Sequence, residues 1–185
     1  MGYKGYANPE LLVTPEEVMT RLAHPGLCLV DSRTTYEYAT GHIPGAVHLD
    51  LYGISLNNTG LEVLEAFLWS LSHLLEDRGI GSDSRIVFYE NDSGVRAARG
   101  FWICECLGHK DVQVLDGGFE EWTSAGYPME TAYPKVETKK FESREGLDRH
   151  IGVEEIKGLL GCKDFVALDV RSNDEYYARN VRSKR

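Results

Sequence analysis

Short apolar runs alternate with amphipathic stretches along the first two thirds of the chain, and this alternation predicts an α/β fold. The runs are rich in Val, Ile and Leu and nearly continuous in apolar character, which is typical of parallel strands covered on both faces. The predicted strands are residues 27–31, 46–50, 85–90 and 112–116.

The stretches between these strands have the period of helices. Thr14 is followed by a proline and, three residues on, by Glu17, which together predict a helix start with a capping box. Leucines repeat at three- and four-residue steps from Leu61 to Leu75, so that helix presents one stripe to the core. Further helices are predicted at residues 95–107 and 118–123. Strands that alternate with helices favour a central parallel sheet flanked by helices.

An internal repeat appears when the sequence is shifted by 138 positions. The matched pairs are Glu16-Glu17 with Glu154-Glu155, Leu22 with Leu160, Asp31 with Asp169, Arg33 with Arg171, and Glu37-Tyr38 with Glu175-Tyr176. The match keeps its register through a predicted helix and a predicted strand, which indicates a duplicated domain of which only the start of the second copy is present.

The repeat divides the chain into a domain at residues 10–126, a linker at 127–150 and an incomplete second domain at 151–185. A piece of about 35 residues cannot build a core of its own. We therefore expect residues 151–185 to dock on the first domain, to stay frayed, or to mediate self-association.

The charge of the chain bears on its partners. The formal net charge is −9 over 185 residues, and residues 1–126 hold 8 basic and 18 acidic side chains. Such an acidic body repels phosphate backbones, so we expect no nucleic-acid partner.

No apolar run approaches the roughly 20 residues of a membrane span, and the first residues lack the apolar core of a signal peptide. The four cysteines have neither metal-ligand nor disulfide-framework spacing, so we expect a soluble, cytoplasmic protein with reduced thiols and no membrane partner.

Several segments together resemble the rhodanese superfamily. The first signature is Leu-Val-Asp-Ser-Arg at 29–33, then Glu-Tyr at 37–38 and Gly-His-Ile-Pro-Gly-Ala at 41–46; the second is Leu-Gly-His at 107–109, then Val-Gln-Val-Leu-Asp-Gly-Gly-Phe-Glu-Glu-Trp at 112–122. The duplication resembles the two-domain thiosulfate and mercaptopyruvate sulfurtransferases of that superfamily. The resemblance covers residues 12–130 and resumes from 150 to 178. It implies a parallel sheet flanked by helices, with two domains packed face to face around one active site.

Some signature residues have structural tasks that need no catalysis. Gly41 and Gly45 are expected to permit positive φ. Asp31 and Arg33 lie two apart at a strand end, so they can pair or hold loop carbonyls. Arg33 is also a candidate for binding an anion.

The resemblance places the family's chemistry in a loop between a strand and a helix. There a cysteine thiolate holds sulfane sulfur as a persulfide, and loop N–H groups stabilise the anion. The corresponding loop consists of Asn91, Asp92, Ser93, Gly94, Val95 and Arg96. Gly94 and Arg96 fit the family pattern, and Arg96 is the second candidate for anion binding. Asn91 stands at the nucleophile's position.

An amide is not nucleophilic and cannot form a persulfide, so no residue of this domain is assigned as catalytic. The phosphatase relatives of the fold place their cysteine where this chain has Glu90. The remaining thiols are expected to be inert, with Cys28 buried in a strand, Cys104 and Cys106 pointing apart on one helix, and Cys162 beyond the linker. The repeat projects the matching loop of a second domain to about residue 229.

Three hypotheses follow. The leading one is the non-catalytic first domain of a two-domain sulfurtransferase plus the start of its second domain. The complete protein would use a small anionic sulfur donor and neither metal nor organic cofactor. Thiosulfate itself is disfavoured as that donor, because Glu175 stands where the active domain of thiosulfate-type enzymes commonly has an arginine. The second hypothesis is a rhodanese-homology module that binds an anion or an acidic partner through the same loop. The third is the product of a premature stop or frameshift, which predicts poor folding and association.

Overall fold

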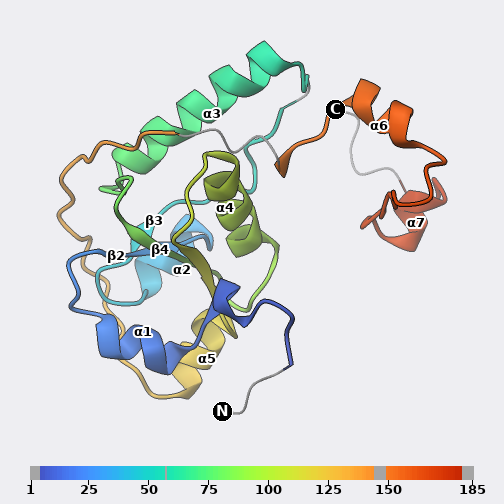
Figure 1. Cartoon of the computed structure of the whole chain (residues 1–185). Helices are drawn as coiled ribbons and strands as arrows, with labels where there is room; N and C mark the ends of the chain where they lie inside the picture. Colours follow the sequence, from blue (N-terminus) through green and yellow to red (C-terminus); the bar gives the residue numbers. More distant parts are fainter. Residues whose placement is uncertain (1–4, 57, 144–148, 181–185) are drawn as a thin grey trace. The chain divides into compact units, whose positions relative to one another are not determined.

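A five-stranded parallel sheet forms the centre of the larger unit of the chain in the computed structural model (Figure 1), which describes residues 5–56, 58–143 and 149–180. The strands are β1 (Leu12–Val13), β2 (Leu27–Asp31), β3 (Val47–His48), β4 (Arg85–Tyr89) and β5 (Val112–Leu115). Their order is β1-β5-β4-β2-β3, and every neighbouring pair is parallel. The predicted fold class is confirmed. The two-residue β1 was missed because it is too short to produce a pattern, and β3 is shorter than predicted.

Six helices accompany this sheet in the described part of the larger unit. They are a 3-10 turn (Pro9–Leu11), α1 (Pro15–Arg21), α2 (Thr35–Thr40), α3 (Leu61–Glu76), α4 (Val95–Cys106) and α5 (Gly118–Ser124). The predicted capping box at the start of α1 is present, with Thr14 and Glu17 bonded to each other's backbone. A second capping box joins Thr34 to Glu37 and starts α2, a helix that the sequence analysis did not predict.

Both faces of the sheet are covered, as the continuous apolar strands predicted. In β4, Ile86 and Phe88 face the core beneath α3 and α4, whereas Val87 and Tyr89 face the core that contains Trp122 of α5. Figure 1 shows α3 and α4 on one side of the sheet and α1 and α5 on the other. The leucine stripe of α3 is buried from Leu64 onward, but Leu61 is 60% exposed. Leu61 is the first residue of the helix, so it precedes the part of α3 that packs on the core.

The segment expected to be a linker lies along the larger unit in its described part. The backbones of His42 and Glu130 exchange two hydrogen bonds of 2.9 Å. Further on, the side chain of Phe141 is 3% exposed and contributes to the core, and its N–H donates to Glu76 Oε1 over 2.9 Å. The contacts of the chain divide it into two units between His150 and Ile151.

The smaller unit contains two short helices, α6 (Val153–Leu159) and α7 (Asn173–Tyr176). No described residue from 151 to 180 belongs to a strand or is buried. The basic end after residue 180 lies outside the described residues.

The elements of the smaller unit coincide with those of the larger one at an offset of 138. The bounds of α6 are those of α1 displaced by 138, and α7 starts at the position that matches the start of α2. Ser172 and Glu175 form the same capping box as Thr34 and Glu37. The two segments that were matched by sequence therefore share their helix starts and a capping box, but the counterpart of β2, residues 165–169, is not a strand, so the expectation of a repeated strand was wrong.

One ion pair repeats atom by atom between the two units. In the larger unit, the N–H of Arg33 donates to Asp31 Oδ1 over 2.9 Å, and its Nη2 donates to Asp31 Oδ2 over 2.6 Å. In the smaller unit, the same bonds join Arg171 to Asp169 over 3.0 and 2.6 Å. The first pair is buried and the second is exposed.

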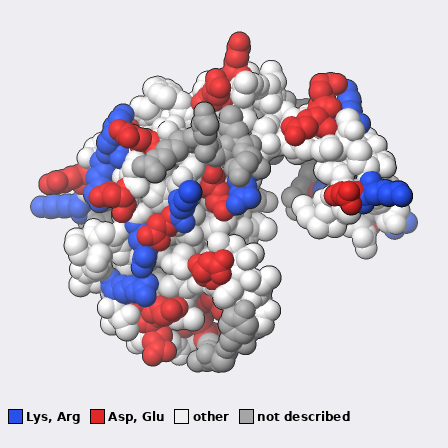
Figure 2. All heavy atoms as spheres, in the orientation of Figure 1, with Lys and Arg blue, Asp and Glu red and all other residues white. Residues whose placement is uncertain are grey.

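Charges of both signs are interspersed on the face of the larger unit that Figure 2 shows, and Lys and Arg lie among Asp and Glu there. The absence of a nucleic-acid partner stays a prediction. Among the described residues, no helix is both long and apolar enough to cross a membrane.

Candidate functional site

The loop that connects β4 to α4 is fixed by the turn between β5 and α5. The N–H of Phe119 donates to the carbonyl of Glu90 over 2.7 Å, and the N–H of Glu120 donates to the carbonyl of Asn91 over 2.8 Å. A Cβ added to Gly118 would lie 2.4 Å from the carbonyl oxygen of Asp92, and the φ of Gly118 is +57°. Only glycine allows this turn to approach the loop so closely.

Ser93 ties the same turn to the loop through its hydroxyl group. Its Oγ accepts a hydrogen bond of 2.7 Å from the N–H of Gly117 and donates one of 3.2 Å to the carbonyl of Leu115. Of the six loop residues singled out from the sequence, Ser93 thus has a structural task.

Asn91 lies at the exposed mouth of the loop and contacts α2. Its Nδ2 donates to Glu37 Oε1 over 2.7 Å. This bond, together with those from Thr34, lowers the pKa of Glu37 to about 2. The position that the resemblance assigns to the nucleophile therefore holds a side-chain amide bonded to a carboxylate.

Glu90 also belongs to this site, although the sequence analysis named it only as the residue at the position of the phosphatase cysteine. Its side chain turns back over the loop, and its Oε1 accepts hydrogen bonds from the N–H groups of Arg96 and Ala97 over 2.7 and 3.2 Å. These are first-turn donors of α4, which have no partner within the helix. The sequence could show only that a glutamate precedes the loop; the direction of its side chain required the structure.

The two arginines proposed for anion binding both pair with carboxylates. Arg96 Nη1 is bonded to Asp50 Oδ2, and the guanidinium lies 5.2 Å from the ring centre of Tyr52. Arg33 is 4% exposed, pairs with Asp31, and donates to the carbonyl of Gly41 over 2.6 Å. The sequence-based expectation that Asp31 and Arg33 pair and hold a loop carbonyl is confirmed. Anion binding by either arginine stays a prediction.

The four cysteines differ in how far they are buried. Cys104 and Cys106 are buried, and burial raises the pKa of the Cys104 thiol well above its usual value. Cys28 is half-buried, with its Sγ 4.0 Å from the carbonyl oxygen of Gly79, so the expectation that it is buried was too strong. It belongs to the first half of β2, where the strand is less completely covered. Cys162 is exposed.

The signature glycines and histidines contribute to the frame of the site. Gly45 has a φ of +77°, as expected, but Gly41 has a φ of 162°, which is extended backbone, so the prediction of positive φ there was wrong. Gly41 ends α2 in an extended conformation, with its N–H still bonded to the helix. His42 is fully buried and its ring nitrogens contact the carbonyls of Tyr38 and Ala132.

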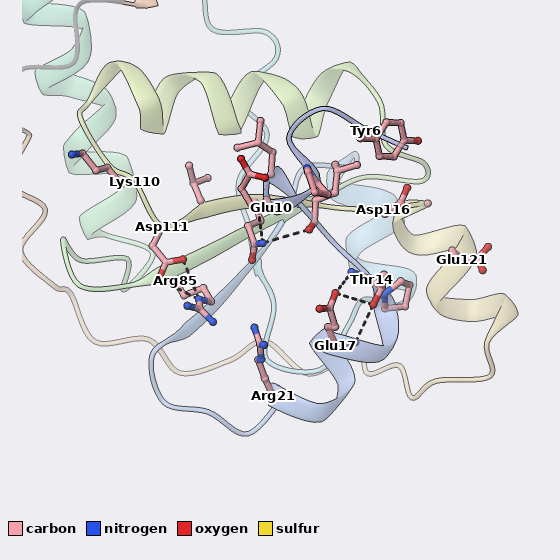
Figure 3. Close-up of a pocket in the computed structure, with 17 residues that line it drawn as sticks. Tyr6, Glu10, Thr14, Glu17, Arg21, Arg85, Lys110, Asp111, Asp116 and Glu121 are labelled. Atoms are coloured by element: carbon pink, nitrogen blue, oxygen red, sulfur yellow. Dashed lines mark hydrogen bonds and ion pairs between the residues drawn. The ribbon is translucent and has the colours of Figure 1, made fainter. Parts of the chain in front are cut away.

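A separate pocket of about 950 Å³ lies along the β1–β5 edge of the sheet (Figure 3). Its lining includes Arg85 and Asp111, which form an ion pair of 3.0 Å, and Glu17, which is engaged in the capping box with Thr14. None of its residues belongs to the loop 91–96, and the sequence analysis singled out none of them as a site. Among the described residues, no group of three His, Cys, Asp or Glu could hold a metal ion.

The chain is thus an α/β protein with a parallel sheet, in which the loop of interest connects the strand β4 to the helix α4. Residues 14–125 match the model of the Rhodanese-like domain. The chain belongs to this family, and the resemblance seen in the sequence is confirmed.

Named relatives and solved structures agree with this assignment. The chain is 31% identical over 186 residues to the sulfur carrier protein TtuD of Thermus thermophilus, with 93% of this chain and 61% of that protein covered. It is 30% identical over 181 residues to a thiosulfate sulfurtransferase of Corynebacterium glutamicum, with 94% and 58% covered. The chain therefore spans less than two thirds of the length of these relatives. The crystal structure of SseA from Escherichia coli, a 3-mercaptopyruvate sulfotransferase, shares the fold with a TM-score of 0.72 at 19% identity, covering 80% of this chain and 62% of that one.

Proposed function

We propose that this chain comprises the non-catalytic first domain of a two-domain, sulfurtransferase-type protein together with the start of the second domain. On its own it does not transfer sulfur. The observation that carries the proposal is the loop after β4, where an asparagine amide bonded to Glu37 stands at the position that the family uses for its cysteine. Sulfur transfer by this family's chemistry needs a thiolate there, because the nucleophile donates an electron pair to the sulfane sulfur. A side-chain amide is not nucleophilic and cannot do this.

The offset of 138 supports a second, partial copy. Helix bounds, a capping box and an ion pair all recur at that spacing. The curated relatives are longer than this chain, and a second domain accounts for that difference in length.

The complete protein would take sulfur from a small anionic donor and pass it on through a cysteine persulfide in the second domain. The names of the relatives, a sulfur carrier and a thiosulfate sulfurtransferase, support this reaction class. A cytoplasmic location, where the thiols stay reduced, forms part of the same proposal.

The test is a thiocyanate assay with cyanide as acceptor and either thiosulfate or mercaptopyruvate as donor. The chain is compared with a variant in which all four cysteines are replaced by serine, and with a two-domain homologue as positive control. We expect the chain and its cysteine-free variant to produce thiocyanate at the same background rate. A rate for the unmodified chain that exceeds the cysteine-free rate would overturn the proposal.

A further inference from the structure

Four donor groups around the loop 91–96 face carboxylates of the same chain. The N–H groups of Arg96 and Ala97 donate to Glu90. The Arg96 guanidinium pairs with Asp50, and the Asn91 amide donates to Glu37. The positive end of α4 is thus already matched by negative charge from within the chain.

Glu90 is held in this position by the backbone on either side of it. Its carbonyl accepts the 2.7 Å bond from Phe119, which fixes residue 90 at the end of β4. Its side chain then passes over Gly94, where an added Cβ would lie 2.8 Å from Oε1 of Glu90. Gly94 has a φ of −97°, so its backbone does not require glycine. A side chain at this position would instead meet the carboxylates of Asp92 and Glu90, at 2.6 and 2.8 Å from the added Cβ, and would have to displace both.

We infer that Glu90 is an intramolecular anion that fills the N–H cradle of this loop and excludes external anions from it. The inference deepens the proposed function, since it explains why the loop of a non-catalytic domain also does not act as a ligand site. An incoming oxyanion would have to compete with Glu90 for the N–H groups of Arg96 and Ala97. It would also approach the carboxylates of Asp92 and Asp50, which oppose it by like charge.

The inference bears on the second of the three hypotheses that the sequence left open. A rhodanese-homology module that binds an anion through this loop requires free N–H groups at the start of α4. In this chain the N–H groups of Arg96 and Ala97 become free only if the side chain of Glu90 moves away from them. Glu90 is therefore the specificity-determining residue of the loop.

The test titrates thiosulfate and sulfate into the full chain while the amide resonances of Arg96 and Ala97 are followed by ¹H–¹⁵N NMR. The wild-type chain should show no saturable shift. Glu90→Ala removes the carboxylate and should bind both anions at least about tenfold more tightly, which corresponds to gaining one charge-assisted contact. Glu90→Gln keeps an oxygen that can accept the same two bonds, so this variant should show no saturable shift, like the wild type.

Glu120→Ala is the matched control, because it removes one exposed negative charge near the loop without freeing the two N–H groups. Equal binding by wild type, Glu120→Ala and Glu90→Ala would overturn the inference, as would the absence of binding to a folded Glu90→Ala chain. If Glu90→Ala does not fold, the wild type decides: saturable shifts at Arg96 and Ala97 refute the inference, and their absence supports it. Thiocyanate production by the same wild-type sample would instead refute the proposed function and leave the binding result standing.

Discussion

Asn91 and Glu37 lie 54 positions apart in the sequence, and the Nδ2 of Asn91 donates a hydrogen bond of 2.7 Å to the Oε1 of Glu37. This bond joins the mouth of the loop to α2. It is the main cause of the low pKa of Glu37, about 2, and the bonds from Thr34 add to it.

Replacing Asn91 by alanine should raise the pKa of Glu37 toward its usual value. The bond favours the charged carboxylate of the folded state, so its contribution to stability is present above the ordinary pKa of 4.5 and is lost as the pH falls toward 2. The free energy of unfolding of Asn91→Ala should therefore depend less steeply on pH between these values. A ¹³C NMR titration of the Glu37 carboxyl carbon measures the pKa directly.

Asp92→Asn serves as the control for this titration. It changes the neighbouring loop residue and leaves the Asn91 bond in place, so the pKa of Glu37 should stay low in this variant. An unchanged Glu37 pKa in Asn91→Ala would show that the bond contributes nothing in solution.

Restoring a thiol at the family's position should not restore sulfur transfer. In Asn91→Cys the introduced sulfur would stand beside the carboxylate of Glu37, with Glu90 still bonded to the first-turn N–H groups of α4. Like charge and the loss of these donors both raise the pKa of a thiol and reduce the thiolate that reacts. The pH dependence of iodoacetamide labelling, resolved by peptide mass spectrometry, should place the pKa of this thiol above its ordinary value.

The double variant Asn91→Cys with Glu37→Gln provides the comparison. It removes one facing carboxylate, so labelling should begin at lower pH than in Asn91→Cys alone. Identical pH profiles for the two variants, or thiocyanate production by Asn91→Cys alone, would contradict the prediction.

The fold of the larger unit could be predicted from the sequence because its signals are local. Continuous apolar strands such as Arg85–Tyr89 and the capping box at Thr14 depend on neighbouring residues, and both were found where expected. The chemistry of the site depended on pairs distant in sequence, such as Arg96 with Asp50 and Asn91 with Glu37. No periodicity encodes such pairs. They arise from the way α2, the segment after β3 and the loop meet at one edge of the sheet.

The repeated ion pair allows a comparison of one interaction in two environments. Arg33→Ala leaves Asp31, which is fully buried, without its partner, and should destabilise the larger unit by about 3–5 kcal/mol. The corresponding Arg171→Ala removes an exposed pair and should leave the transition of the larger unit unchanged. Urea denaturation followed by tryptophan fluorescence, to which the buried Trp122 contributes, measures both. Equal effects of the two substitutions would show that burial does not distinguish these pairs.

Self-association through the smaller unit is the last prediction, and it follows from apolar side chains that nothing in that unit covers. Val166, Leu168 and Val170 are 83%, 82% and 87% exposed, whereas Val30, the counterpart of Leu168 at the offset of 138, is fully buried between two strands. Exposed apolar surface of this kind favours association. Sedimentation velocity should show a larger mean mass at higher concentration of the chain.

Replacing Val166 and Leu168 by aspartate should abolish that concentration dependence, because a charged residue would have to be desolvated in the contact. The matched control is Leu61→Asp, which makes the same change at a 60% exposed leucine of the larger unit and should associate like the wild type. If Leu61→Asp also abolishes association, the contact involves α3. If the wild type stays monomeric at every concentration, the exposed residues of the smaller unit have no partner in a second copy of this chain.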